Sequence, residues 1–349
     1  MLHKRHNSVV TLAILLTLVG VSKPAKAFLL AQSDTAPATF TVPDKLSEDA
    51  TVKITTSNST DSINASLQES FTNKYPQAEI ETETQDSSAA LNRIAEGQAD
   101  LAAIGRNLTA EEKAKGFATV PVSREKIAII ISTNNPYDGN LTIDQFAQIF
   151  RGEITDWSEI GGAPGAIELV DLPDANDTRQ AFPNYPIFQS AEFSTGATAT
   201  QLEEDSTEAA IAQLGDNSIS YAVANDVINR DDVKIVTMHT TQPDDPRYPF
   251  SQPFNLIYQG TPSEAAQAYL GYATAEGGQE IVASRVGSIS TAAISTIAAG
   301  AAGLTNQTDL SPDPDANADV AAETEIDPTA DVDADASADL ASGSGLKSV

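Results

Sequence analysis

Few of the side chains that perform covalent or metal chemistry are present in this sequence. It contains no cysteine, and of its three histidines His3 and His6 lie in an N-terminal segment with the features of a leader. His239 is then the one histidine of a mature chain. Ser-His-Asp, Cys-His and zinc sites need residues that are almost missing here. Solvated carboxylates are weak evidence for a catalytic pair, so we expect no enzyme and no cofactor.

Small polar residues and two arginines stand instead where expected strands give way to expected helices. The groups are Ser57-Asn58-Ser59, Asp86-Ser87-Ser88, Arg106 and Asn176-Asp177-Thr178-Arg179. Ser, Asn, Asp and Thr at such junctions commonly cap helices by accepting backbone N–H bonds. Helix N-termini also present unsatisfied N–H donors to anions. Each group can therefore be a cap alone or part of a binding site, and both interpretations stay open.

An alternation of strands and helices would position these groups. Strands are expected over residues 52–56, 78–84, 99–104, 127–131, 167–172, 219–223, 233–238 and 254–258. Ile63, Leu67 and Phe71 recur at helical spacing, and Thr109 and Thr142 begin further helices. Such alternation is typical of an α/β fold.

The two ends of the chain differ from this central region. Residues 1–27 combine a basic start, a short apolar run and Ala25-Lys26-Ala27, which predicts a secretory signal. Residues 28–50 are expected to be a linker, 51–290 the folded domain and 291–349 a disordered acidic tail. The tail is a solubilising segment, or alternatively a spacer or a weak attractor of Ca²⁺. The predicted location is periplasmic or extracellular.

The net charge of −29 is strongly acidic. Such a surface repels nucleic acid at long range and favours solubility, so we expect no nucleic-acid partner. Nothing in the sequence indicates an oligomer, and a monomer is expected.

The stretch from Leu141 to Gly162, LTIDQFAQIFRGEITDWSEIGG, is long and unusual. It resembles a block of the phosphate-binding periplasmic components of ABC transporters, in which a helix, a glycine and an I-T-x-W segment precede two glycines. The block itself is interpreted as structural. Further resemblance runs in order from about Val52 to Val282, through Tyr75-Pro76, Gly97-Gln-Ala-Asp100, Ser218-Ile-Ser-Tyr221, Tyr248-Pro-Phe250 and Gly277-Gly-Gln279.

This resemblance implies a type II periplasmic binding protein, with two α/β lobes around a cleft and hinge crossovers near residues 127–132 and again later. It implies capture of phosphate or a similar oxyanion for ABC transporter permease subunits. The ligand-binding residues implied are Ser57, Asn58, Ser59, Ser87, Ser88, Arg106, Asn176, Asp177, Thr178 and Arg179.

Four positions depart from the family pattern. Gly105 stands where the family usually has Ser or Asp, Leu172 where many members have an arginine, and Asp86 and Asp177 where a glycine is usual. Leu172 removes a charge-assisted contact typically worth about 1.5–3 kcal/mol. An alternative function is therefore a binding-protein fold that has lost phosphate affinity and acts as a sensor, adhesion or scaffold module.

Overall fold

The computed structural model describes residues 39–285 and 287–290. The strands are β1 Thr51–Ser57, β2 Glu79–Gln85, β3 Leu101–Ile104, β4 Phe117–Ser132, β5 Asn140–Leu141, β6 Glu168–Asp171, β7 Thr200–Gln201, β8 Ser218–Val223, β9 Val233–Ile235, β10 Thr237–Met238, β11 Ser251–Gln259 and β12 Ser288–Ser290. The α-helices are α1 Asp61–Lys74, α2 Ser87–Ala95, α3 Ala110–Ala114, α4 Ile143–Phe150, α5 Asp177–Ala181, α6 Thr207–Ala212, α7 Ala224–Val227, α8 Glu264–Thr274 and α9 Glu276–Ser284. The short 3-10 helices are η1 Asn58–Thr60, η2 Trp157–Ile160, η3 Phe182–Asn184 and η4 Pro186–Gln189. The predicted signal and acidic tail lie outside the described residues.

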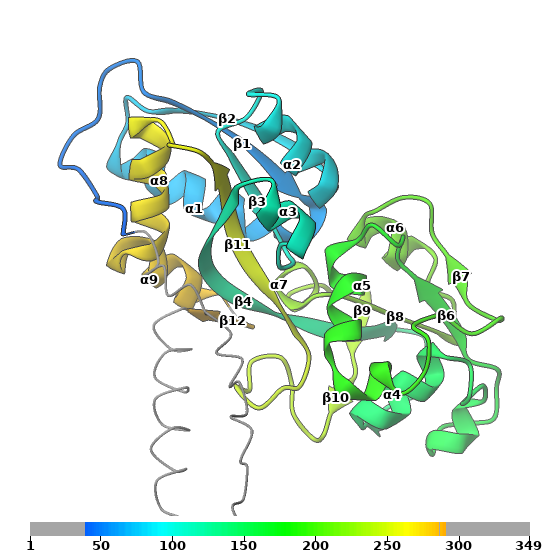
Figure 1. The fold of residues 1–349 in the computed structure, drawn as a ribbon. Coiled ribbons are helices and arrows are strands. Elements are labelled where there is room, and N and C mark those ends of the chain that lie inside the picture. Colours follow the sequence, from blue (N-terminus) through cyan, green and yellow to red (C-terminus); the bar gives the residue numbers. More distant parts are fainter. Residues whose placement is uncertain (1–38, 286, 291–349) are drawn as a thin grey trace, which may run out of the picture. The chain divides into compact units, whose positions relative to one another are not determined.

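The first lobe is a sheet in the order β2-β1-β3-β11-β4 with helices on both faces (Figure 1). β1 pairs in parallel with β2 and β3, whereas β11 is antiparallel to β3 and β4. Alternate residues of β3 face opposite sides. Leu101 and Ala103 join the core beneath α1 and α8, and Ala102 and Ile104 join the core beneath α2. This two-sided burial explains why residues 101–104 form a continuous apolar run.

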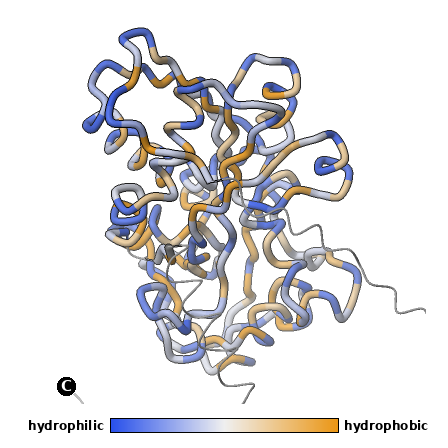
Figure 2. The backbone as a smooth tube through the Cα atoms, turned by 60° about the vertical axis from the view of Figure 1, so that its left-hand side comes forward, coloured by the Kyte–Doolittle hydropathy of each residue, from blue (hydrophilic) through white to orange (hydrophobic). Residues whose placement is uncertain are grey.

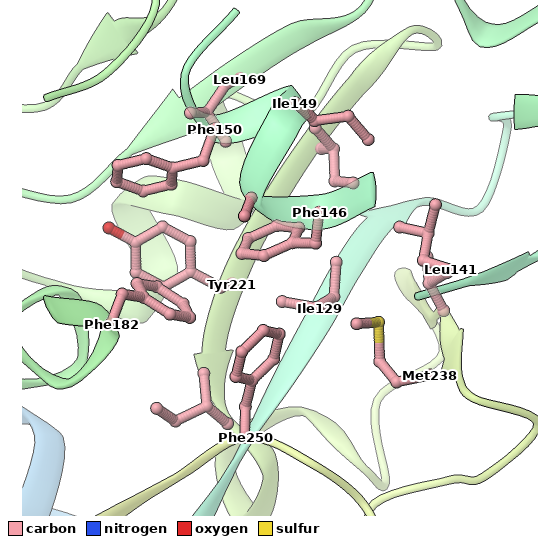
Figure 3. Close-up of a cluster of buried hydrophobic side chains, with 14 of the residues drawn as sticks. Ile129, Leu141, Phe146, Ile149, Phe150, Leu169, Phe182, Tyr221, Met238 and Phe250 are labelled. Atoms are coloured by element: carbon pink, nitrogen blue, oxygen red, sulfur yellow. The ribbon is translucent and has the colours of Figure 1, made fainter. Parts of the chain in front are cut away.

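The second lobe is built around β8, which is antiparallel to β4 and parallel to β6. Its main core is a cluster of aromatic rings (Figure 3). Phe182 lies 4.8 Å from the ring of Tyr221 and 5.3 Å from that of Phe250, both in edge-to-face geometry. Residues Ile127, Ile129 and Ile131 face this cluster, while Ala128 and Ile130 face a smaller one around Val227.

One long strand, β4, belongs to both lobes (Figure 1). Lys126 pairs with Ser251 of β11, and the next residue, Ile127, pairs with Val223 of β8. The change of partner falls at the start of the range predicted for the first crossover. The chain returns along β11, because Phe250 lies in the second lobe's core and Phe254 in the first lobe's core. Figure 2 shows apolar residues along these central strands and hydrophilic ones on many of the outer loops.

Residues 39–50, assigned to a linker from the sequence, pack against the first lobe. Leu46 and Ala50 belong to its core, and the ring of Phe40 meets that of Tyr258 edge to face at 5.6 Å. The Tyr75 hydroxyl donates a hydrogen bond to the carbonyl oxygen of Pro43. The structure therefore moves the start of the packed region to before residue 51, because these apolar side chains cover β-sheet and helix surfaces.

The Leu141–Gly162 block is structural, in agreement with the interpretation of its sequence. Thr142 and Gln145 form a capping box that begins α4, and Gly152 follows the helix with a φ of 72°. The ring of Trp157 packs on that of Tyr137 at 4.8 Å, and Gly161 reverses the chain with a φ of 86°. Among the described residues, no helix combines the length and apolarity that a membrane span requires.

The two positive-φ glycines of this block provide a matched pair of stability variants. A Cβ on Gly152 would lie 2.9 Å from the Cα of Gly196, whereas a Cβ on Gly161 would meet nothing within 4 Å. We expect Gly161→Ala to lower the free energy of unfolding by about 1–2 kcal/mol, because alanine is strained in the left-handed conformation. Gly152→Ala should lower it by about 1–3 kcal/mol more, because its Cβ also overpacks against Gly196. Urea unfolding of both variants measures the difference. Equal losses would show that the segment around Gly196 moves aside without a cost in stability.

Candidate anion-binding site

Polar groups of the first lobe converge on the carboxylate of Asp177, the first residue of α5 in the second lobe. Ser87 donates its hydroxyl to this carboxylate, with oxygen distances of 2.6 and 2.7 Å. The Gly105 N–H donates at 2.7 Å and the Ser59 hydroxyl at 3.4 Å, both to Oδ2. Arg106 Nε lies 3.7 Å from Oδ1. We call Ser59, Ser87, Gly105 and Arg106 the cradle.

Local capping places these groups. Asp86 caps α2 by accepting bonds from the N–H groups of Ser88 and Ala89, which leaves the Ser87 hydroxyl free to reach Asp177. Asn176 caps α5 by accepting a bond from the N–H of Arg179 at 2.8 Å. Asp177 therefore begins its helix while its side chain extends into the other lobe.

The Asp177 carboxylate is buried, and the hydrogen bonds of the cradle compensate for its burial. The Asp177 residue is 2% exposed, and this burial raises its pKa against the lowering effect of the bonds from Ser87 and Gly105. Arg106 donates from Nη1 and Nη2 to both oxygens of Glu112 at 2.8 Å. This pairing raises the pKa of Arg106 and lowers that of Glu112. The cradle thus stabilises negative oxygen atoms mainly by hydroxyl and backbone donors, as expected of an oxyanion site.

Some of the residues implied by the sequence meet at the cradle. Ser59, Ser87, Arg106 and Asp177 do so directly. The Ser57 hydroxyl lies 3.3 Å from that of Ser59, and its hydrogen bond to Asp177 also lowers the pKa of that carboxyl.

Among the described residues, no hydrogen bond joins the other implied residues to the cradle. Ser88 is exposed, and Asn58 lines a separate pocket. Asn176 serves as a cap and donates to Asp205 at 2.6 Å. Thr178 is 2% exposed within α5. Arg179 donates to Asp171 at 2.8 Å and lies over the ring of Phe193, so its charge is used within the second lobe.

Gln252 is a residue of this site that sequence reasoning missed. It is fully buried, and neither atom of its side-chain amide has a hydrogen-bond partner among the described residues. A Cβ added to Gly105 would lie 2.5 Å from its Nε2 and 2.4 Å from the Ser59 hydroxyl oxygen. The one available signal was its place just after Tyr248-Pro249-Phe250, a segment that contributed to the resemblance.

A pocket of about 420 Å³, which we call the second pocket, contains Asn58 and is separate from the cradle. Its lining residues are Asn58, Asp61, Ser62, Ser206, Thr207, Glu208, Asn225 and Asp226. The carboxylates of Asp61, Glu208 and Asp226 give it an acidic character that disfavours anions. Burial raises the pKa of Asp226 to about 6, with the Ser62 hydrogen bond opposing the rise.

Two α/β lobes joined by crossing strands, with a buried polar site where they meet, define a solute-binding class of protein. Residues 38–276 match the model of the family described as PBP superfamily domain, so the chain belongs to that superfamily. Its fold is that of the type II periplasmic binding proteins.

Curated relatives match a part of the chain. The phosphate-binding protein PstS of Bacillus subtilis (strain 168) is 30% identical over 134 residues, covering 37% of this chain and 43% of the relative. Phosphate-binding protein PstS 2 of Streptococcus agalactiae serotype V is 26% identical over 109 residues, covering 31% and 37% respectively. The matched segments thus span less than half the length of these relatives.

Solved structures match over a larger share. One from Clostridium perfringens, assigned as a phosphate ABC transporter substrate-binding protein and solved with bound phosphate, has a TM-score of 0.59 and 27% identity. The match covers 69% of this chain and 99% of that one. An ABC-type phosphate transport receptor from Vibrio cholerae, with a TM-score of 0.55 and 21% identity, shows the same fold. It covers 69% of this chain and 100% of the other.

The raised pKa of Asp226 generates a pH prediction. In the unfolded chain an aspartate has a pKa near 3.9, so the native state binds the Asp226 proton more tightly than the unfolded state does. The stability that this bound proton contributes is lost as the pH rises from about 3.9 to about 6. We expect Asp226→Asn to raise the melting temperature at pH 7.5, to lose most of that advantage by pH 4.5 and to lose the rest below about pH 3.9. Thermal melts across this range provide the measurement.

The exposed Asp231→Asn is the matched control, because it removes the same charge without relieving burial. A pH dependence shared by both variants would attribute the effect to overall charge and contradict the assignment to Asp226.

Proposed function

We propose that this chain is an exported solute-binding protein that captures phosphate or a related oxyanion between its lobes and delivers it to the permease subunits of an ABC-type uptake transporter. The predicted signal over residues 1–27 would direct export to the periplasm or exterior. The protein would act as a monomer without a cofactor, and the acidic residues 291–349 would solubilise it or space it from another surface.

The observation that carries this proposal is the set of donors converging on one buried carboxylate. Hydroxyls of Ser59 and Ser87 and the N–H of Gly105 point at the same pair of negative oxygens, with Arg106 beside them. Donors that stabilise carboxylate oxygens also stabilise phosphate oxygens, because they form charge-assisted hydrogen bonds with the negatively charged oxygens of either group. The similarity to the phosphate-bound Clostridium protein supports the same ligand class.

Binding of phosphate to the mature chain, residues 28–349, tests this function by thermal stability. A ligand at 100 times its dissociation constant adds about 2.7 kcal/mol of stability, which shifts the melting temperature measurably. We expect a shift with phosphate or arsenate. Sulfate and simple carboxylates serve as comparison ligands. A cooperative melt that no anion shifts would contradict the proposal and favour a module that kept the fold for sensing or scaffolding.

Alanine variants of two adjacent serines test where the anion binds. Ser87 is a buried member of the cradle, and Ser88 is exposed on the same helix turn. In a chain that also carries Asp177→Gly, which frees the Ser87 hydroxyl from its carboxylate partner, Ser87→Ala should weaken phosphate binding by about tenfold or more, since a hydrogen bond to a charged group is typically worth about 1.5–3 kcal/mol. Ser88→Ala should leave the affinity unchanged. Equal effects in titration calorimetry would place the anion away from the cradle.

A further inference from the structure

The Asp177 carboxylate already uses the donors that an oxyanion would need. The Gly105 N–H carries a single proton and donates it to Oδ2, and the Ser87 hydroxyl has one proton to donate to the same carboxylate. A second anion beside this buried carboxylate would find its nearest donors taken. It would also meet a like charge in a site from which water is largely excluded.

From these contacts we infer that Asp177 is a tethered occupant of the anion site, which phosphate must displace, and that this residue sets the affinity of the site. The inference rests on the proposed function and deepens it. Asp177 belongs to the second lobe, and its partners belong to the first, so its contact with the cradle also joins the two lobes. Displacement of the carboxylate breaks this connection unless the ligand replaces it.

Gly105 makes room for the tethered carboxylate. A Cβ on Gly105 would lie 3.0 Å from the Cβ of Asp177 and closer still to Ser59 and Gln252. The glycine at position 105 and the aspartate at position 177, both departures from the pattern of the family that the chain resembles, are therefore complementary. Position 105 has no side chain, and the Asp177 carboxylate occupies the adjoining space.

Gln252 indicates that the cradle can serve a larger anion than a carboxylate. Its buried amide lies close to Gly105, yet it makes no hydrogen bond among the described residues. A carboxylate has two oxygens in one plane, whereas phosphate presents four in a tetrahedron. An oxyanion in place of Asp177 would therefore have oxygens to spare for the Gln252 amide, which makes tetrahedral oxyanions the favoured ligand class.

Titration calorimetry with inorganic phosphate, in a buffer free of other oxyanions, tests this inference on the mature chain. We expect Asp177→Gly to bind phosphate at least tenfold more tightly than the wild type, because the donors of the cradle become free. Asp177→Asn retains the side-chain volume and removes the charge, so it provides a second variant should the glycine variant unfold. It should also bind more tightly, by a smaller factor.

Asp174→Gly is the matched control. It removes a carboxylate from the same segment, but that carboxylate is 81% exposed and pairs with Arg179 outside the cradle. We expect its phosphate affinity to equal that of the wild type. A gain as large as that of Asp177→Gly would mean that long-range charge, and not occupation of the site, limits binding, which would overturn the inference.

The outcomes separate this inference from the proposed function. Weak wild-type binding with tight binding by the Asp177 variants supports both. Tight wild-type binding that the Asp177 variants do not improve overturns the inference and leaves the function standing. Binding by the variants alone supports the inference and overturns phosphate capture by the natural chain. Absence of binding in all of the folded proteins overturns both.

Discussion

A carboxylate removed from water must be compensated by hydrogen bonds or by opposite charge, and the site depends on how this chain meets that requirement at Asp177. The compensation comes from the other lobe, through Ser87, Gly105 and Arg106. Several local features follow from it. Position 105 has no side chain, because one would collide with its neighbours, and the start of α2 is capped by Asp86 so that the Ser87 hydroxyl remains available.

An acidic chain can contain an anion site, because the net charge of the chain and the hydrogen-bond donors of the site act over different distances. A net charge of −29 slows the approach of anions, but salt screens exposed charges beyond about 8–10 Å. Buried hydroxyl and N–H donors act within hydrogen-bond distance and are not screened in this way. The second pocket, with Asp61, Glu208 and Asp226, has the opposite character, so an anion would be directed to the cradle by local donors and not by the general field.

The sequence predicted the longer strands and several of the helices, because their apolar periodicity is local, but it missed α6, α7, α9 and the short strands β5, β7 and β12. Residues 127–131 were recognised as a covered strand, whereas the earlier half of β4 was not, since its buried polar residues are satisfied by distant partners. Glu125, for example, accepts bonds from Asn225 and Ser288. In the site, capping by Asp86 and Asn176 followed from local pattern. The choice of Ser87 over Ser88, and the role of Gln252, depend on tertiary contacts that no local pattern encodes.

The charges around the proposed site favour Asp177, and not the arginines, as the residue that would set its affinity. Arg179 is held by Asp171, which also accepts a bond from Tyr221 at 2.5 Å, so this network fixes the start of α5 but gives no charge to the cradle. Leu172, at the position where many family members have an arginine, is buried in the aromatic core. Among the described residues, Arg106 is the one cation paired with the Asp177 carboxylate, and Glu112 already neutralises it. With the Asp177 carboxylate in place, the formal charge of this group is negative, so an anion that enters without displacing Asp177 has no cation to meet. Displacement of Asp177 would remove its charge from the group and would return the hydroxyl and N–H donors to the ligand.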